Sequence, residues 1–333
     1  MSLQSSITMR SLFCLTAWLL LCVPGVSSGT EDGAERLLRN DRLEVRVMVP
    51  DHPGRYNRGT RFTPIAAVLG VRRDGVEYLY RPETHDPIND HAGLAAEFDL
   101  CIPDGPADAL PSGYQEAAVG EGFLKIGVGA LRKPAKTYHL FMTPALLEPA
   151  VTTVEWQANR AVFHQIFDGR TTPGYSYRLD AVLSLEGASL AVDWKLTNTG
   201  TKPITTRQYT HNFFRIADRP TASGYILSFP YDIQPKGLEE GQKLAGRSIH
   251  FTGAIPRWIN ATIAYPSGYA GRNIVTLRHP RAGREIICET SDPGLRTDIH
   301  ARADYISPEQ FIEIILPPGG SHSWTRKYTF LDD

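Results

Sequence analysis

The chain has 333 residues and nearly balanced charges, with 35 Lys and Arg against 36 Asp and Glu and a net charge of −1. No long basic run is present, which argues against nucleic acid or an anionic membrane as the main partner, because both require a positive patch. The 29 glycines and 24 prolines indicate many turns, as a strand-rich protein requires.

The first residues have the layout of a secretory signal peptide. Arg10 is followed by the apolar run in "SLFCLTAWLLLCVPGVSSG", which is too short to span a bilayer comfortably, and then by small residues. We therefore expect a signal peptide over residues 1–28 and a flexible mature N-terminus over residues 29–40. The mature protein is expected to be exported, either periplasmic or extracellular, with no membrane association after cleavage.

Apolar and polar residues alternate in most segments after residue 40, starting with "RLEVRVMV" and continuing in "RAVFHQIF", "SYRLDAVLSL" and "SLAVDWKL". Turn sequences such as "EGAS", "NTGTKP" and "PPGG" separate these segments. No ten-residue segment of the sequence shows a convincing pattern of apolar residues at helical spacing. We predict an all-β protein with few helices: a large antiparallel β-sandwich that forms a single domain over residues 41–333.

The longest polar stretch is "RPETHDPINDHAGLAAEF", residues 81–98, and long loops on a rigid sheet commonly carry function. His85 and His91 lie in it with Asp86 and Asp90 between them, a set of side chains that could hold a metal. A hydrogen-bonded loop is the alternative for these residues. We predict no metal site.

Glycines punctuate the next strand, "GEGFLKIGVGALRKP", residues 120–134. The segment lacks the ending of a phosphate-binding loop, and glycines within a strand indicate bulges or the close approach of another group. Lys125 lies between these glycines and either shares a cleft or is a surface residue. Outside the signal, Cys101 and Cys288 are either a disulfide or two buried thiols.

The main question that the sequence raises is the role of His211. In "LTNTGTKPITTRQYTHNFFRI", residues 196–216, alternation places Tyr209 and Phe213 on the same side as His211, and Thr210 and Asn212 on the other. A histidine among aromatic rings is either a hydrogen-bonded core residue or a proton donor beside a sugar, whose C–H face stacks on such rings.

The segment "SLAVDWKLTNTGTKPITTRQYTHNFFRI" resembles the galactose mutarotase-like superfamily, which includes the aldose 1-epimerases. It has the amphipathic strand, the turn and, as "THNFF", the histidine motif of that family. The later segments "REIICETSDPGL" and "SPEQFIEIILPPGGSHSWTRKYTF" resemble the strand with the family's catalytic glutamate, its turn and its closing aromatic strand. Residues 54–80 and 120–134 look like a secreted branch of the same superfamily.

The resemblance implies aldose 1-epimerase chemistry. One base takes the proton of the anomeric hydroxyl while one acid protonates the ring oxygen, and no metal or organic cofactor is required. On the family pattern His211 is the acid and Glu289 the base, with Glu309 as the rival carboxylate. The candidate substrate-binding residues are His91, Lys125, Arg61, Tyr209 and Asn212.

Two other functions stay open. A polysaccharide lyase that cleaves a uronic-acid polymer by β-elimination requires a cation to neutralise the carboxylate, a role available to Arg55, Arg58, Arg61 and Lys125. A non-catalytic carbohydrate-binding protein requires only a cleft. In all three cases the partner is a mono-, oligo- or polysaccharide, and the oligomeric state is left open.

Overall fold

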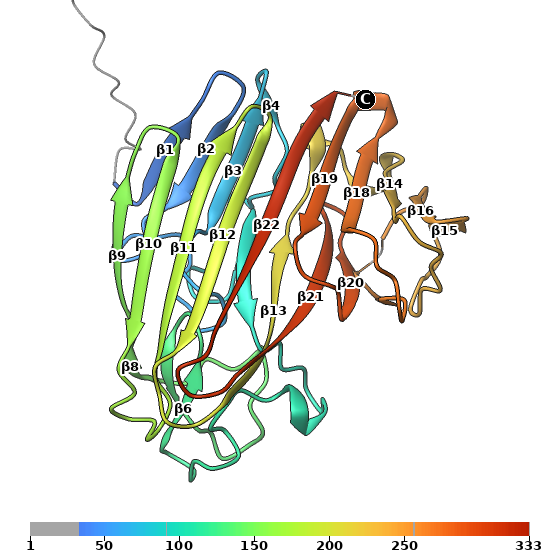
Figure 1. The fold of residues 1–333 in the computed structure, drawn as a ribbon. Helices are drawn as coiled ribbons and strands as arrows, with labels where there is room; N and C mark the ends of the chain where they lie inside the picture. The colour runs from blue at the N-terminus through green and yellow to red at the C-terminus, as the bar shows by residue number, and fades with distance from the viewer. Residues whose placement is uncertain (1–32, 91, 256, 333) are drawn as a thin grey trace, which may run out of the picture.

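The structure is a computed structural model that describes residues 33–90, 92–255 and 257–332 (Figure 1). The predicted signal peptide (1–28) and His91 lie outside the described residues. Strands make up nearly all of the regular structure, joined by short 3₁₀ turns. The strands are β1 (Glu35–Arg39), β2 (Glu44–Met48), β3 (Val68–Arg73), β4 (Val76–Glu77), β5 (Leu94–Phe98), β6 (Gly122–Lys125), β7 (Gly129–Arg132), β8 (Leu146–Pro149), β9 (Val151–Trp156), β10 (Arg160–Phe167), β11 (Tyr177–Glu186), β12 (Ser189–Asn198), β13 (Ile204–Asn212), β14 (Ile226–Ser228), β15 (Gln242–Ala245), β16 (Ser248–Phe251), β17 (Ile259–Ala264), β18 (Asn273–His279), β19 (Arg284–Thr290), β20 (Arg296–Ala301), β21 (Ile306–Leu316) and β22 (Ser321–Asp332), and the 3₁₀ turns are η1 (Ala107–Ala109), η2 (Ile216–Asp218), η3 (Thr221–Ser223) and η4 (Pro280–Ala282).

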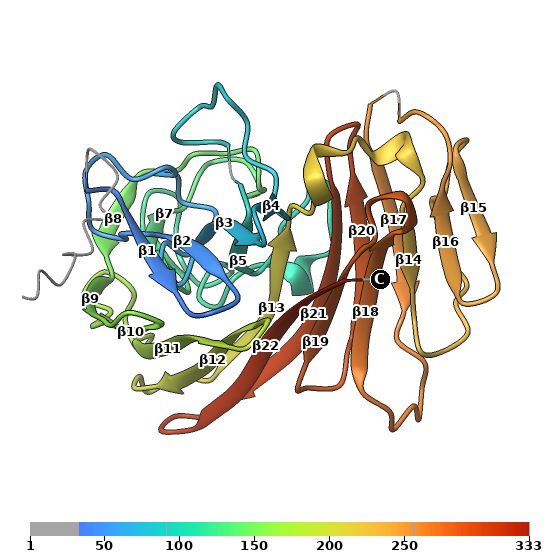
Figure 2. The ribbon, with the colours of Figure 1, turned by 90° about the horizontal axis from the view of Figure 1, so that it is seen from above.

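Two large antiparallel sheets face each other, as Figure 2 shows from above. The nine-stranded sheet has the order β1-β2-β3-β5-β13-β21-β20-β17, with β4 paired to β3. The ten-stranded sheet has the order β15-β16-β14-β18-β19-β22-β12-β11-β10-β9, and β6, β7 and β8 form a small third sheet. The predicted fold class, an all-β antiparallel sandwich with few helices, is confirmed.

The predicted boundary at residue 40 needs a correction. Residues 35–39 were expected within a flexible N-terminus, but they form β1, which pairs with β2 from Glu35 opposite Met48 to Arg39 opposite Glu44. Leu38 of this strand is buried in the main core. The burial of Leu38 and the pairing with β2 explain why residues 35–39 form a strand.

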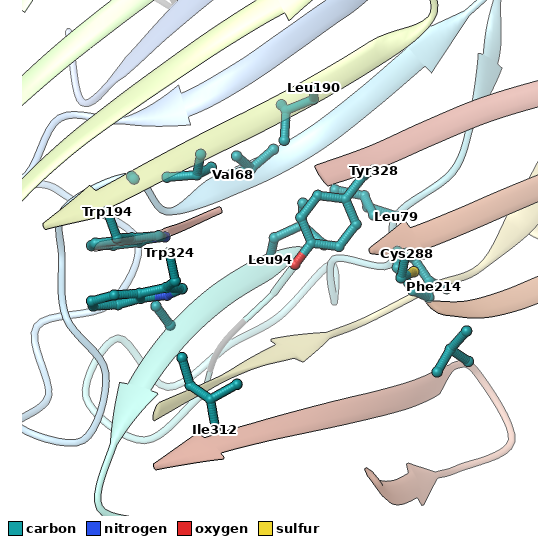
Figure 3. Close-up of a cluster of buried hydrophobic side chains, with 14 of the residues drawn as sticks. Val68, Leu79, Leu94, Leu190, Trp194, Phe214, Cys288, Ile312, Trp324 and Tyr328 are labelled. Atoms are coloured by element: carbon teal, nitrogen blue, oxygen red, sulfur yellow. The ribbon is translucent and has the colours of Figure 1, made fainter. Parts of the chain in front are cut away.

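The core lies between the two large sheets, and strand β12 shows how the sequence builds it. Leu190, Val192, Trp194 and Leu196 are buried, while Asp193 and Lys195 are exposed, in agreement with the predicted alternation. Trp194 stacks on Trp324 of β22 with ring centroids 5.9 Å apart (Figure 3). Burial of such apolar surface supplies about 25 cal/mol per Å² and is the main stabilising term.

The nine-stranded sheet has an inner face, which packs on the core, and an outer face turned away from the ten-stranded sheet. On β13 the side chains of Thr206, Gln208 and Thr210 are on the inner face, whereas Tyr209 and His211 are on the outer face. Because a strand alternates its side chains, β21 likewise places Ile312 inward and Glu309 outward. The outer face carries the candidate site.

Cys101 and Cys288 are both free and buried, which decides between the two alternatives for them. Within the described ranges, the structure has no helix with the length and apolar character needed to cross a membrane.

Candidate functional site

His211 on β13 lies directly opposite Glu309 on β21. The two strands pair from Ile204 opposite Leu316, and the same register reaches Phe214 opposite Ile306. The His211 Nε2 atom is 3.2 Å from Oε1 of Glu309. The register of two neighbouring strands thus creates a histidine–carboxyl pair on the outer face, here called the His211–Glu309 pair.

Ser307 holds both members of this pair. Its hydroxyl donates to Glu309 Oε1 at 3.1 Å and lies 2.8 Å from His211 Nδ1. Because the hydroxyl has one hydrogen and directs it at Glu309, the hydrogen-bond network assigns the Nδ1 proton to His211, which donates it to Ser307. Nε2 then faces Oε1, and a single proton shared between these two atoms completes the contact.

Aromatic rings enclose the pair. The His211 ring stacks on Phe213 with centroids 4.2 Å apart and an interplanar angle of 5°, and Phe62 presents its edge at 6.1 Å. Only 4% of His211 and 3% of Glu309 are exposed. Burial raises the pKa of Glu309 well above its ordinary value, and the charge of Asp298 raises it further, against smaller opposing effects of Arg61 and Ser307.

A second histidine, His300 of β20, stands beside the pair with its ring edge-on to His211 at 5.5 Å. Its Nε2 is 3.0 Å from the Tyr305 hydroxyl. In the orientation of the Asn260 amide that satisfies its neighbours, the amide nitrogen donates to His300 Nδ1 at 2.7 Å and the oxygen accepts from Trp258 Nε1 at 3.3 Å. Nδ1 is therefore an acceptor, as in a neutral imidazole.

We expect His300 to make the protein less stable in acid. Burial, followed by the charges of Arg61 and Arg302, lowers its pKa from 6.5 to about 4. The unfolded chain then binds more protons between these values, so stability is lost as the pH falls from about 6.5 to about 4. Urea unfolding of wild type and His300→Gln across this range checks the sign: the difference in stability between the two proteins should change with pH. A constant difference would contradict the prediction.

Three of the predicted substrate-binding residues meet at one buried carboxylate instead. Glu97 of β5 accepts from Arg61 Nε at 2.8 Å, from the Tyr209 hydroxyl, and from Lys125 Nζ at 3.5 Å. Arg61 also donates to the Tyr209 hydroxyl at 3.0 Å, and Lys125 donates to the backbone oxygens of Phe98 and Asp99. We call this group the Glu97 cluster.

The Glu97 cluster corrects the expected roles of Lys125 and Tyr209. Both side chains are 0% exposed, so neither can contact a substrate in this arrangement. Lys125 ties the end of β6 to the end of β5, and Tyr209 stacks on Phe311 at 4.4 Å. Arg61 keeps a partly exposed side chain and is the one member of the cluster that still reaches the surface.

Asn212 is on the inner face, away from the site. Its amide donates to the Pro308 carbonyl at 2.6 Å and accepts from the Tyr328 hydroxyl at 2.9 Å. It therefore fastens β13 to its neighbours within the core. The predicted substrate contact is not found, because alternation turns Asn212 to the opposite side from His211.

Glu289 does not meet His211 either. It lies on β19 of the ten-stranded sheet, where Arg272 binds both of its carboxylate oxygens at the surface, with Nε 2.7 Å from Oε1. His211 belongs to the nine-stranded sheet. The expectation that these two residues share one cleft is wrong for this structure, and the rival carboxylate Glu309 occupies the position beside the histidine.

The histidine-rich loop is organised by its own hydrogen bonds. His85 stacks on Tyr56 at 4.0 Å and contacts the Tyr56 carbonyl oxygen at 3.0 Å, while Asp86 bonds to Asn89. Within the part of the chain that the structure describes, no group of three or more His, Cys, Asp or Glu side chains is arranged to hold a metal ion.

A cavity lies beside Phe62 on the same outer face, with an empty volume of about 360 Å³, its open mouth included. Its lining includes Tyr56, Ala67 and Ala95, and Ala95 is the cross-strand neighbour of His211. Phe62 thus stands between the His211–Glu309 pair and an open space.

Ser307, His300 and Phe62 were not singled out in the sequence. A signal existed for Ser307, because a strand over "ISPEQF" puts Ser307 and Glu309 on one face. His300 and Phe62 reach the pair only through the pairing of β20 with β21 and through the loop before β3. Local patterns do not encode such contacts.

A scan against protein-family models finds no match, and a search of curated proteins finds none. Solved structures do match. A protein from Synechocystis sp. PCC 6803 is 14% identical with a TM-score of 0.60 over 90% of this chain and 96% of that one. A galactose mutarotase-like protein from Lactobacillus casei is 14% identical with a TM-score of 0.56 over 89% and 100%. An aldose epimerase homologue from C. elegans is 13% identical with a TM-score of 0.50 over 90% and 99%.

The chain has the galactose mutarotase-like fold. The resemblance seen in "THNFF" and in the closing strands is thereby confirmed for the scaffold. One scaffold can carry several chemistries, so the activity has to be argued from the side chains of the site.

Proposed function

We propose that the protein binds a reducing sugar at the His211–Glu309 pair and interconverts its anomers, as an aldose 1-epimerase does. The observation that carries the proposal is the 3.2 Å contact between Nε2 and Oε1. The anomeric hydroxyl and the ring oxygen are bonded to the same carbon, so an acid and a base that serve both must be neighbours. The secretory signal predicted for residues 1–28 would place this activity outside the cytoplasm.

The single proton shared by His211 and Glu309 suits the reaction. With the shared proton on His211, Glu309 takes a proton from the anomeric hydroxyl and His211 gives one to the ring oxygen, which opens the ring. After rotation about the bond between C1 and C2 the two residues exchange roles and the ring closes on the other face. Oε1 of Glu309 already contacts Ser307 and His211, so we assign Oε2 to the sugar. A carboxyl with a raised pKa is suited to both halves of this cycle.

The ring of Phe62 packs edge-on against the buried His211, so we expect Phe62 to move when a sugar reaches the pair. The ring of Phe62 also lines the neighbouring cavity, which is open to solvent. Phe213, stacked on His211, would remain as an aromatic surface for the C–H face of the sugar.

The lyase alternative receives less support. Two of the cations available for it, Arg61 and Lys125, already neutralise Glu97. A uronic carboxylate would have to displace that buried partner, which is costly in a low-dielectric site.

Polarimetry on freshly dissolved hexoses and pentoses tests the proposed activity. We expect the protein to accelerate the approach to anomeric equilibrium for at least one aldose. A rate equal to the spontaneous rate for every sugar would reject the proposal. Unsaturated products from a uronic-acid polymer would then favour a lyase, and saturable binding without turnover a binding protein.

A further inference from the structure

A buried arginine occupies the interior of the sandwich. Arg326 of β22 is 3% exposed and faces β13 on its inner side, the side opposite His211. Its guanidinium donates to Gln208 Oε1 at 2.7 Å, to the Gln208 carbonyl at 3.3 Å and to Thr290 Oγ1 at 2.6 Å. All of these acceptors are uncharged.

Among the residues that the structure describes, the charge of Arg326 has no direct counter-ion, since no carboxylate lies within ion-pair distance of it. The charge of the Asp292 carboxylate raises the pKa of Arg326, but Asp292 is itself hydrogen-bonded to His322. Burial lowers the pKa of Arg326 to about 10, and this value still leaves the guanidinium charged at neutral pH. An isolated charge in a protein interior is strongly unfavourable unless something compensates for it.

A cavity adjoins this charge. Arg326, Trp194, Thr210 and Tyr328 contribute to its lining, and the remaining walls are apolar, including Val68 and Leu94. Figure 3 shows Val68, Leu94, Trp194 and Tyr328 around this part of the core. The space admits a guest about the size of one water molecule or one small ion.

Two residues that line this cavity each have a hydrogen-bond donor without an acceptor among the described residues. The buried Nε1 of Trp194 has no acceptor among the described residues. The Arg326 guanidinium has five N–H groups and makes four contacts with the described residues. Two of these contacts are to Gln208 Oε1, one is to the Gln208 carbonyl and one is to Thr290. One N–H group on Nη1 therefore has no acceptor among the described residues. A guest in this cavity therefore lies beside a positively charged residue, and both residues with an unused donor contribute to its walls.

We infer that the cavity binds one monovalent anion of about the size of chloride, held by the Arg326 guanidinium and the Trp194 indole N–H. A water molecule would accept the same hydrogen bonds but would leave the charge uncompensated. Carboxylates, phosphate and sulfate contain several heavy atoms and exceed the space. The anion contacts β12 and β22 of the ten-stranded sheet. It compensates the charge of Arg326, which itself bonds to Gln208 of β13, the strand that carries His211 on its other face.

Urea unfolding at increasing sodium chloride, with ionic strength held constant by sodium acetate, tests the inference. A ligand that binds only the folded state raises the folding constant about tenfold for each tenfold increase in its concentration above its Kd. We expect this dependence in the wild-type protein and its loss in Arg326→Met, which removes the charge and keeps an unbranched apolar side chain. Trp194→Phe, which removes only the N–H donor and some ring volume, should weaken the dependence of stability on chloride. Arg247→Met, at an exposed ion pair with Asp232, is the matched control and should show the same chloride dependence as wild type.

Crystals of the wild-type protein grown in sodium bromide provide a direct readout that does not depend on whether a variant folds. An anomalous peak beside Arg326 and Trp194 supports the inference. A cavity that contains only water, or a wild-type protein whose stability responds to chloride no more than Arg326→Met does, would overturn it.

Discussion

Glu309→Gln is expected to slow anomer interconversion by about 10²–10⁴-fold, the usual loss when one acid–base partner is removed. Glutamine has the shape of the carboxyl and can still accept the hydrogen bond from Ser307, but it cannot take the proton of the anomeric hydroxyl. His211→Gln is expected to have an effect of similar size, because the two residues exchange one proton across a 3.2 Å contact.

Glu289→Gln is the matched control for this series. Glu289 lies on the other large sheet and binds Arg272 at the surface, so its amide variant should keep the wild-type rate. Rates from polarimetry at several sugar concentrations separate kcat from KM. A Glu309→Gln protein that is as active as wild type, or a Glu289→Gln protein that is inactive, would contradict the role of Glu309 as the carboxyl that exchanges protons with the sugar.

Glu309→Gln should also be at least as stable as wild type above acidic pH. Since burial raises the pKa of Glu309 in the folded state, its contribution to stability is present below the unfolded pKa of about 4.5 and is lost as the pH rises through the folded value. Glutamine does not titrate, so the variant should not show this loss. Urea unfolding of both proteins at pH 4 and pH 8 therefore distinguishes a loss of catalysis from a loss of folding.

Lys125→Met is expected to reduce the free energy of unfolding by about 3–5 kcal/mol, the range for breaking a buried ion pair from one side. Lys125 is 0% exposed, and its ammonium group is 3.5 Å from Glu97 and 3.1 Å from the Asp99 carbonyl. Removal of the cation leaves these acceptors facing an apolar side chain. It also removes the tie between β6 and β5.

Lys195→Met is the matched control, because Lys195 is exposed on β12 and its loss should barely move the urea midpoint. Unfolding curves for the three proteins, followed by tryptophan fluorescence and by circular dichroism, check the prediction. If Lys125→Met unfolds at the wild-type midpoint, the ion pair between Lys125 and Glu97 does not stabilise the fold.

The alternation within single strands was enough to predict which side chains share a face. On β12, Leu190, Val192 and Trp194 are buried as expected, and on β13 Tyr209 and His211 share one side. These are relations between residues i and i+2, which depend only on the pleat of the chain.

The partners of those side chains were predicted less well. Lys125 and Tyr209 were expected to face a sugar, and they meet Glu97 in a buried cluster instead. Glycines around Lys125 indicated the close approach of another group, but they did not say that the group would be protein. Asn212 could have been assigned to the core from alternation alone, since it lies opposite to His211 along β13.

Alternation and turn chemistry were sufficient to predict the fold class. The family resemblance pointed to His211 as the acid and to Glu289 as the base, with Glu309 only as the rival carboxylate. The choice between the two carboxylates depends on the strand order, which places Glu309 and not Glu289 beside His211. The reason is physical: β13 meets β21 in one sheet while β19 pairs with β18 and β22 in the other. The order and register of strands far apart in the chain arise from the packing of the whole sandwich, which the residues of one strand do not record.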